Sequence, residues 1–382
     1  MNMVSFPPPE ALPRIPKLPS PLKLPDGSIL TDPSQWPAQR DYLKALLEHY
    51  MFGQWPGIDH EVSGEIRETV RIGDTIRKEF VRLSIPSGIA FDLELTYRAD
   101  LRQMPVMVYN SGPDQRAKAT AELLAEGYVL AAYNREQIIP DIAKPGGPPP
   151  NLPPRPDLPC GDIMGWGWGS TLVVNYLEQR GMADGPLIAT GHSRGGKAAA
   201  CAAIYDDRFD VAAPMGSGCG GMGSDRFIGT LAGDRQDSSL CETIGFITHV
   251  IPIWFSPLFG SFGKRDKPHD ITEREQRLPF DSHTLRACMA PRAVFDSEGT
   301  EDNWANPFGT QLAWQAAQPV FDLLGVPERN GYHIRPGKHD FSREDWLALI
   351  TFCNRIFGKN PPAAARPINN PMLEIDAAEF CE

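Results

Sequence analysis

Hydrophobic and polar residues follow two kinds of repeat along this chain. In its first part they alternate with a period of two, over residues 69–72, 79–85 and 91–97. This alternation is typical of antiparallel strands, which bury only one face. A segment with apolar residues at helical spacing, residues 36–50, precedes them and predicts a helix.

Beyond residue 100 the chain changes to short apolar runs that alternate with segments of helical periodicity. Runs that are apolar on both faces indicate parallel strands covered by helices on two sides. The expected strands are 104–109, 128–133, 187–190, 209–213, 292–297 and 331–334, and the expected helices are 117–126, 171–180, 198–204, 310–324 and 343–357. The pattern predicts an α/β fold, a three-layer sandwich with a mostly parallel central sheet and antiparallel N-terminal strands.

Composition and charge narrow the class of protein. Hydrophobic residues make up 41% of the chain and charged ones 22%, which is ordinary for a globular enzyme, and the formal net charge is −11. An acidic chain lacks the basic stripe that replaces phosphate counterions, so we expect no nucleic-acid partner. No apolar run reaches the length of a membrane span, and the seven cysteines show no metal-binding spacing. The N-terminus has no signal-peptide pattern, which leaves a cytoplasmic protein or a secreted one whose signal has been removed.

The turn between the predicted strand 187–190 and the helix after it carries the strongest chemical signal. Residues 191–195 read Gly-His-Ser-Arg-Gly and fit Gly-x-Ser-x-Gly. In this nucleophile elbow, a feature of the α/β-hydrolase fold, a strained turn projects a serine hydroxyl from the sheet. Glycines flank the serine because neighbouring backbone approaches closely. The sequence therefore predicts an α/β-hydrolase with Ser193 as nucleophile.

Segments without a repeat divide the chain. We expect an extended proline-rich arm (1–33), a single α/β-hydrolase domain (34–360) and a C-terminal tail (361–382). Lid-like insertions interrupt the domain at 134–165 and 222–282, and long loops of this kind are usually functional or mobile. The second insertion contains the aromatic run 253–259, which either covers the edge of the sheet or forms a wall of the substrate site.

The serine needs a base and an acid, which in this fold follow it in the order serine, acid, histidine. His339 lies between the last predicted strand and the closing helix, where the fold places the base. Asp302 follows the strand 292–297 and is the favoured acid, with Glu298 and Glu301 as alternatives in the same loop.

The oxyanion of an acyl-transfer intermediate needs donors aimed at the developing charge. The backbone N–H of Arg194 is the expected first donor, and the loop containing Ser111 and Gly112 is placed to supply another. The side chains of Arg194 and Lys197 are unusual cations beside an elbow. They either stabilise an oxyanion or an acidic substrate group, or form structural ion pairs.

Beyond the elbow, the chain resembles the glucuronoyl esterases, α/β-hydrolases that cleave esters of (4-O-methyl)glucuronic acid. The family elbow is Gly-Cys-Ser-Arg-x-Gly-Lys, and residues 191–197 read Gly-His-Ser-Arg-Gly-Gly-Lys. The similarity covers residues 45–358 and continues in the segments 166–169, 217–221, 278–283, 290–292 and 302–304. The resemblance implies that Arg194 assists the oxyanion, Lys197 contacts sugar hydroxyls and Trp304 packs against the sugar. His283, in a shared segment, is a further candidate substrate contact.

Three positions depart from the family pattern. His192 and Asp340 stand where fungal members have two bridged cysteines, and their joint presence indicates a lineage without that disulfide. Gly216 stands where many members carry a glutamate that serves as catalytic acid or sugar contact. The acid must then come from the Asp302 loop, and the specificity for uronates is left open.

The sequence predicts a serine carboxylic ester hydrolase that forms an acyl-enzyme, with no metal and no cofactor. The expected substrate is a saccharide ester of glucuronate, and another small or carbohydrate ester, such as an acetyl ester or a lactone, is the alternative. Two other classes stay open. Residues 191–197 fit most of a nucleotide-binding P-loop, although Ala198 replaces its Ser or Thr. A non-catalytic carbohydrate-binding relative is the second.

Overall fold

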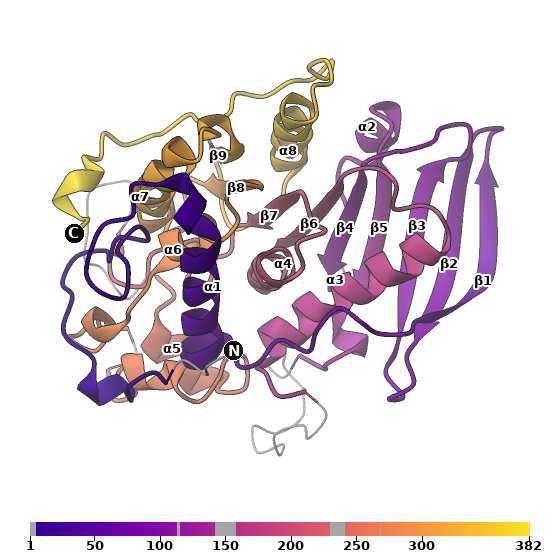
Figure 1. Ribbon diagram of the computed structural model, residues 1–382. Coiled ribbons are helices and arrows are strands. Elements are labelled where there is room, and N and C mark those ends of the chain that lie inside the picture. The colour runs from indigo at the N-terminus through magenta and orange to yellow at the C-terminus, as the bar shows by residue number, and fades with distance from the viewer. Residues whose placement is uncertain (1–4, 113–114, 142–157, 230–240, 268) are drawn as a thin grey trace.

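A single mixed sheet runs through the protein (Figure 1). The computed structural model describes residues 5–112, 115–141, 158–229, 241–267 and 269–382. Within these residues the sheet has nine strands in the order β1-β2-β3-β5-β4-β6-β7-β8-β9. The strands are β1 (Ser63–Ile72), β2 (Ile76–Ser84), β3 (Ala90–Arg98), β4 (Val106–Ser111), β5 (Val129–Asn134), β6 (Leu187–His192), β7 (Val211–Met215), β8 (Ala293–Gly299) and β9 (Asn330–Arg335).

Strand direction divides the sheet as the sequence predicts. β1, β2 and β3 pair antiparallel, and β3 joins β5 antiparallel. From β5 to β9 every pair is parallel. The carboxyl ends of the parallel strands therefore meet at one edge, where α/β proteins place their sites.

Helices cover both faces of the sheet. The helices are α1 (Trp36–Leu47), α2 (Thr120–Ala125), α3 (Asp162–Gln179), α4 (Arg194–Tyr205), α5 (Ile244–Val250), α6 (Ser282–Ala287), α7 (Pro307–Leu323) and α8 (Arg343–Ile356). Along β4, Val106 and Val108 belong to the same buried cluster as side chains of α1, α3 and α4, whereas Met107 and Tyr109 belong to a second cluster with side chains of α2 and α8. The predicted three-layer α/β fold is confirmed.

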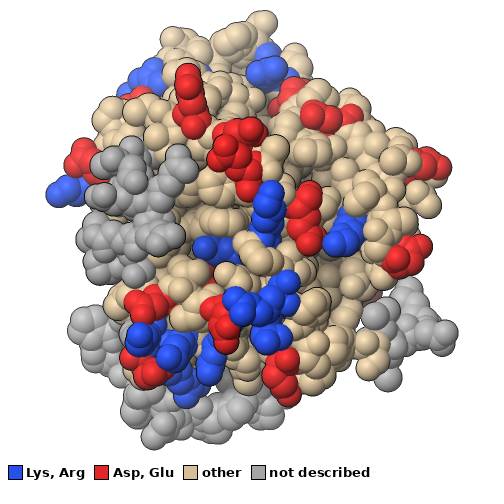
Figure 2. Space-filling model, turned by 90° about the vertical axis from the view of Figure 1, so that its left-hand side faces the viewer, with Lys and Arg blue, Asp and Glu red and all other residues tan. Residues whose placement is uncertain are grey.

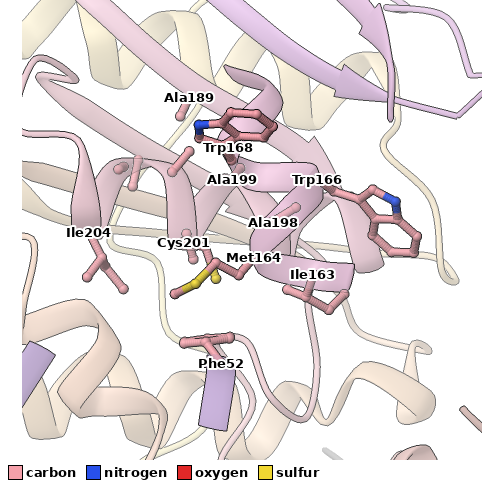
Figure 3. Close-up of a cluster of buried hydrophobic side chains, with 14 of the residues drawn as sticks. Phe52, Ile163, Met164, Trp166, Trp168, Ala189, Ala198, Ala199, Cys201 and Ile204 are labelled. Atoms are coloured by element: carbon pink, nitrogen blue, oxygen red, sulfur yellow. The ribbon is translucent and has the colours of Figure 1, made fainter. Parts of the chain in front are cut away.

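Helix α3 begins earlier than its predicted start at residue 171. Glycine disfavours helices, so the glycine-rich stretch before residue 171 predicts a loop. The structure makes it helical because α3 crosses α4 closely: a Cβ at Gly167 would lie 2.5 Å from the Ala198 carbonyl oxygen. Figure 3 shows this contact region, with Met164 of α3 near Cys201 of α4 and Phe52 beside them. Packing overrides propensity here.

The two predicted insertions differ in how much the structure describes. Residues 142–157 of the first and residues 230–240 and 268 of the second lie outside the described residues. In the second, α5 precedes the aromatic run 253–259, whose Trp254 and Phe255 are buried. These two side chains pack into the main core, which favours the covering role for this run.

The N-terminal arm and the C-terminal tail contact each other. The N–H of Leu18 donates to the Phe380 carbonyl at 2.7 Å, and Leu18 is buried with Leu312 of α7.

Figure 2 shows acidic and basic side chains interspersed over the face of the molecule that it presents. Among the described residues, no helix has the length and apolar character needed to cross a membrane.

Candidate active site

Ser193 occupies the turn between β6 and α4. Its backbone has φ 57° and ψ −122°, a left-handed conformation that L-residues rarely adopt. Its N–H donates to the Met215 carbonyl at 2.9 Å. A Cβ at Gly191 would lie 2.3 Å from the carbonyl oxygen of Gly195, so only glycine fits there. This is the strained strand-to-helix turn that the motif predicts.

Asp302 and His339 form a close pair at the carboxyl ends of β8 and β9. His339 Nδ1 lies 2.6 Å from Asp302 Oδ2. The Asp302 side chain is 3% exposed, and its Oδ1 accepts the N–H of Ala305 at 3.2 Å. The His339 side chain is 33% exposed. A fixed, buried carboxylate on Nδ1 orients an accessible imidazole and leaves Nε2 for a nucleophile.

The two alternative acids lie elsewhere. Glu298 is buried, and its Oε1 lies 3.3 Å from the Thr310 hydroxyl of α7. Burial, followed by the neighbouring carboxylate of Asp302, raises the pKa of Glu298 well above its usual range. Glu301 is exposed. Of the three carboxylates in this loop, Asp302 is the one that contacts His339.

Arg194 is held by an ion pair beside the elbow. Its guanidinium lies 2.5 Å from Asp141 Oδ2 and 5.0 Å from the ring centre of Trp254. Asp141 is fully buried, while the Arg194 side chain is 29% exposed. Because Arg194 is the first residue of α4, its backbone N–H has no acceptor within the helix and is suited to bind an oxyanion.

The hydrogen-bond donors of the loop after β4 already have partners within the protein. The Ser111 hydroxyl donates to the Tyr133 carbonyl at 2.9 Å, and the N–H of Gly112 donates to Gln115 Oε1 at 2.8 Å. Both groups are therefore engaged within the protein. As oxyanion donors they would first have to exchange these partners, so the expectation that this loop supplies the second donor stays a prediction.

Lys197 is buried under the elbow rather than open to solvent. Its Nζ lies 2.7 Å from Glu242 Oε2 and donates to the Ser217 carbonyl at 2.6 Å. The two side chains are 2% and 7% exposed. Of the two readings of this cation, the geometry favours a structural ion pair.

The two remaining candidate substrate contacts, Trp304 and His283, differ in how exposed they are. Trp304 is half-buried, accepts the N–H of Glu242 at its carbonyl, and packs edge-on against Phe246 of α5 with ring centres 5.0 Å apart. His283 is buried, and its Nε2 lies 2.7 Å from the Pro19 carbonyl oxygen. The structure therefore corrects the expectation for His283, which packs under the N-terminal arm.

Sequence reasoning missed the carboxylates that partner the two elbow cations. Asp141 and Glu242 both come from the predicted insertions, where no repeat fixes a side chain's direction. The sequence signal that could have predicted these carboxylates is the pair of cations itself, because buried cations require acidic partners. Among the described residues, no three His, Cys, Asp or Glu side chains gather as a metal ion would need.

Comparisons with known proteins find esterases of similar sequence and structure. A family model described as glucuronyl esterase of fungi matches residues 156–325. The carbohydrate esterase MZ0003, from an unknown prokaryotic organism, is 28% identical over 412 residues, which cover 89% of this chain and 90% of that protein. The 4-O-methyl-glucuronoyl methylesterase 1 of Wolfiporia cocos is 24% identical over 338 residues, covering 85% and 76%. A glucuronoyl esterase structure from Solibacter usitatus has a TM-score of 0.72 at 26% identity, covering 90% of this chain and 98% of that one.

The fold and the elbow, together with these relatives, define the chain as a serine esterase of the α/β-hydrolase class. Within that class it is similar to glucuronoyl esterases, both in sequence and in structure.

Proposed function

We propose that Ser193, His339 and Asp302 form the catalytic triad of an esterase that hydrolyses glucuronate esters of saccharides. The observation that carries the proposal is the 2.6 Å contact between His339 Nδ1 and Asp302 Oδ2, at the edge of the sheet where the strained elbow presents Ser193. Ser193 attacks the ester carbonyl, His339 takes its proton and passes it to the leaving alcohol, and water then hydrolyses the acyl-enzyme.

The charges around the elbow support a neutral ester as substrate. Arg194 is paired with Asp141, and Lys197 is paired with Glu242. A free uronate would add a third carboxylate to these balanced pairs, whereas its ester adds no charge. The backbone N–H of Arg194 then meets negative charge from the substrate only as the tetrahedral oxyanion develops, which is the condition for lowering the barrier.

Hydrolysis of two substrates tests the proposal. Wild type and Ser193→Ala are compared on benzyl glucuronate and on p-nitrophenyl acetate. We expect turnover of the glucuronate by wild type and loss of it in Ser193→Ala. Turnover that survives in Ser193→Ala would overturn the nucleophile.

A second ester class has its own supporting observation. Gly216 provides no side chain beside the triad, so the sugar contact that a glutamate makes in many family members is missing. If serine-dependent turnover is seen only with p-nitrophenyl acetate, the triad stands and the acyl group is a small ester instead of a glucuronate.

A further inference from the structure

The residue before the nucleophile lies against the catalytic histidine. His192 ends β6, one peptide bond from Ser193, and its ring centre is 4.5 Å from that of His339 at an interplanar angle of 41°. The same ring is 6.3 Å from Phe341 at 28°, close to parallel. His339 and Phe341 both belong to the loop between β9 and α8. One side chain of the elbow thus contacts two rings of the histidine loop.

The histidine loop is itself anchored to the core through the second of these rings. Phe341 stacks on Trp346 of α8 with ring centres 4.2 Å apart and an angle of 11°. Tyr109 of β4 meets both rings edge-on. The contacts run from a fully buried tryptophan to the catalytic imidazole, and His192 is the elbow's member of this group.

Gly216 leaves the room that His192 occupies. A Cβ at Gly216 would lie 3.1 Å from His192 Nε2, tighter than ordinary van der Waals contact, and 3.9 Å from His339 Cε1. Gly216 also has φ 53°, so a side chain there would be strained as well as crowded. A bulky residue at 216 and the observed position of the His192 ring exclude each other.

The His192 ring is suited to packing without charge. His192 is 8% exposed, and its Nε2 has no hydrogen-bond partner among the described residues. Burial, followed by the proximity of His339, lowers the pKa of His192 well below its usual range. The ring therefore stays neutral while His339 takes up the proton from Ser193 during the reaction.

We propose that His192 is a positioning residue of the triad, whose ring fixes the position of the nucleophile elbow relative to the histidine loop. The inference rests on the proposed triad. It assigns a function to the pairing of His192 with Gly216: the glycine makes room for the ring, and the ring fixes the distance between two catalytic residues that come from different strands.

The test is the rate at which a fluorophosphonate labels Ser193 in folded protein. His192→Ala removes the ring, and because an error of about 1 Å between reacting groups can cost about 100-fold in rate, we expect labelling to slow by 10- to 100-fold. His192→Phe keeps a ring and should retain most of the rate. Leu312→Ala, a buried change in α7 that lies in a separate cluster, should lower Tm and leave the labelling rate unchanged.

A second pair of variants tests the same idea if His192→Ala does not fold. Gly216→Ala should slow labelling because its Cβ displaces the His192 ring. Gly181→Ala is the matched control, since Gly181 has φ 60° but open space around its Cβ position. It should leave the labelling rate unchanged.

Each outcome bears on one claim. Absence of labelling in wild type would refute the proposed triad rather than the role of His192. Labelling of His192→Ala at the wild-type rate, or a loss in His192→Phe as large as in His192→Ala, would overturn the role of the ring. Equal effects of Gly216→Ala and Gly181→Ala would overturn it too.

Discussion

Replacing Lys197 with methionine should destabilise the protein strongly. Methionine keeps most of the length of the lysine stem but carries no charge. Glu242 would then remain 7% exposed, with its carboxylate deprived of the cation that now lies 2.7 Å away. The Ser217 carbonyl would lose a donor at 2.6 Å.

The size of the loss follows from the burial of this pair. Removing one partner of a buried pair costs about 3–5 kcal/mol, because the remaining charge is uncompensated. Replacing both partners with apolar residues is often close to neutral. Lys197→Met combined with Glu242→Leu should therefore recover much of what Lys197→Met loses. The matched surface control is Arg14→Met, which breaks a pair whose side chains are 49% and 63% exposed, and it should cost at most about 1 kcal/mol.

Urea denaturation followed by circular dichroism measures the free energy of unfolding of these variants. A loss in Lys197→Met no larger than in Arg14→Met would refute the argument from buried charge. If the double variant is as unstable as Lys197→Met, the cost comes from packing instead of the unpaired carboxylate.

Two further predictions concern the acid loop. Asp302→Asn keeps an oxygen for the Ala305 N–H but presents an amide to His339, so we expect kcat to fall by about 10⁴-fold with little change in stability. The control is Glu301→Gln, a change of an exposed side chain that should keep the wild-type kcat. Equal losses of kcat in the two variants would refute the assignment of Asp302 as the acid. Glu298→Gln should change kcat little because Glu298 contacts Thr310 of α7 instead of His339. Burial raises the pKa of Glu298 and so favours its protonated form, which an amide resembles. The unfolded chain ionises near a pKa of about 4.3, so wild type should lose stability relative to Glu298→Gln as pH rises from there to the raised pKa. Urea unfolding between pH 4 and 8 checks this, and a difference independent of pH would contradict it.

Local patterns in the sequence predict much of this fold. The parallel strands follow from apolar runs, and the elbow follows from glycines placed where backbone approaches closely. The early start of α3 could not be predicted in this way. Its glycines look like a loop until the path of α4 against them is known, and that path is a long-range property.

The choice of the catalytic acid likewise could not be predicted from local patterns, because it depends on where one side chain points. Position along the chain narrows the choice to Glu298, Glu301 and Asp302, which lie within five residues of one another. The selection depends on direction: Glu298 points toward Thr310 of α7, while Asp302 points toward His339. No periodicity in a loop encodes that difference.

The insertions contribute directly to the electrostatics of the candidate site. Asp141 reaches Arg194 from the first insertion, and Glu242 reaches Lys197 from the second. The elbow motif supplies both cations, but its net charge is set by residues far away in the sequence. Two proteins with the same elbow and different insertions would therefore present different charge to a substrate. The basis of substrate choice in this chain should accordingly be sought in the insertions and at Gly216, more than in the serine motif.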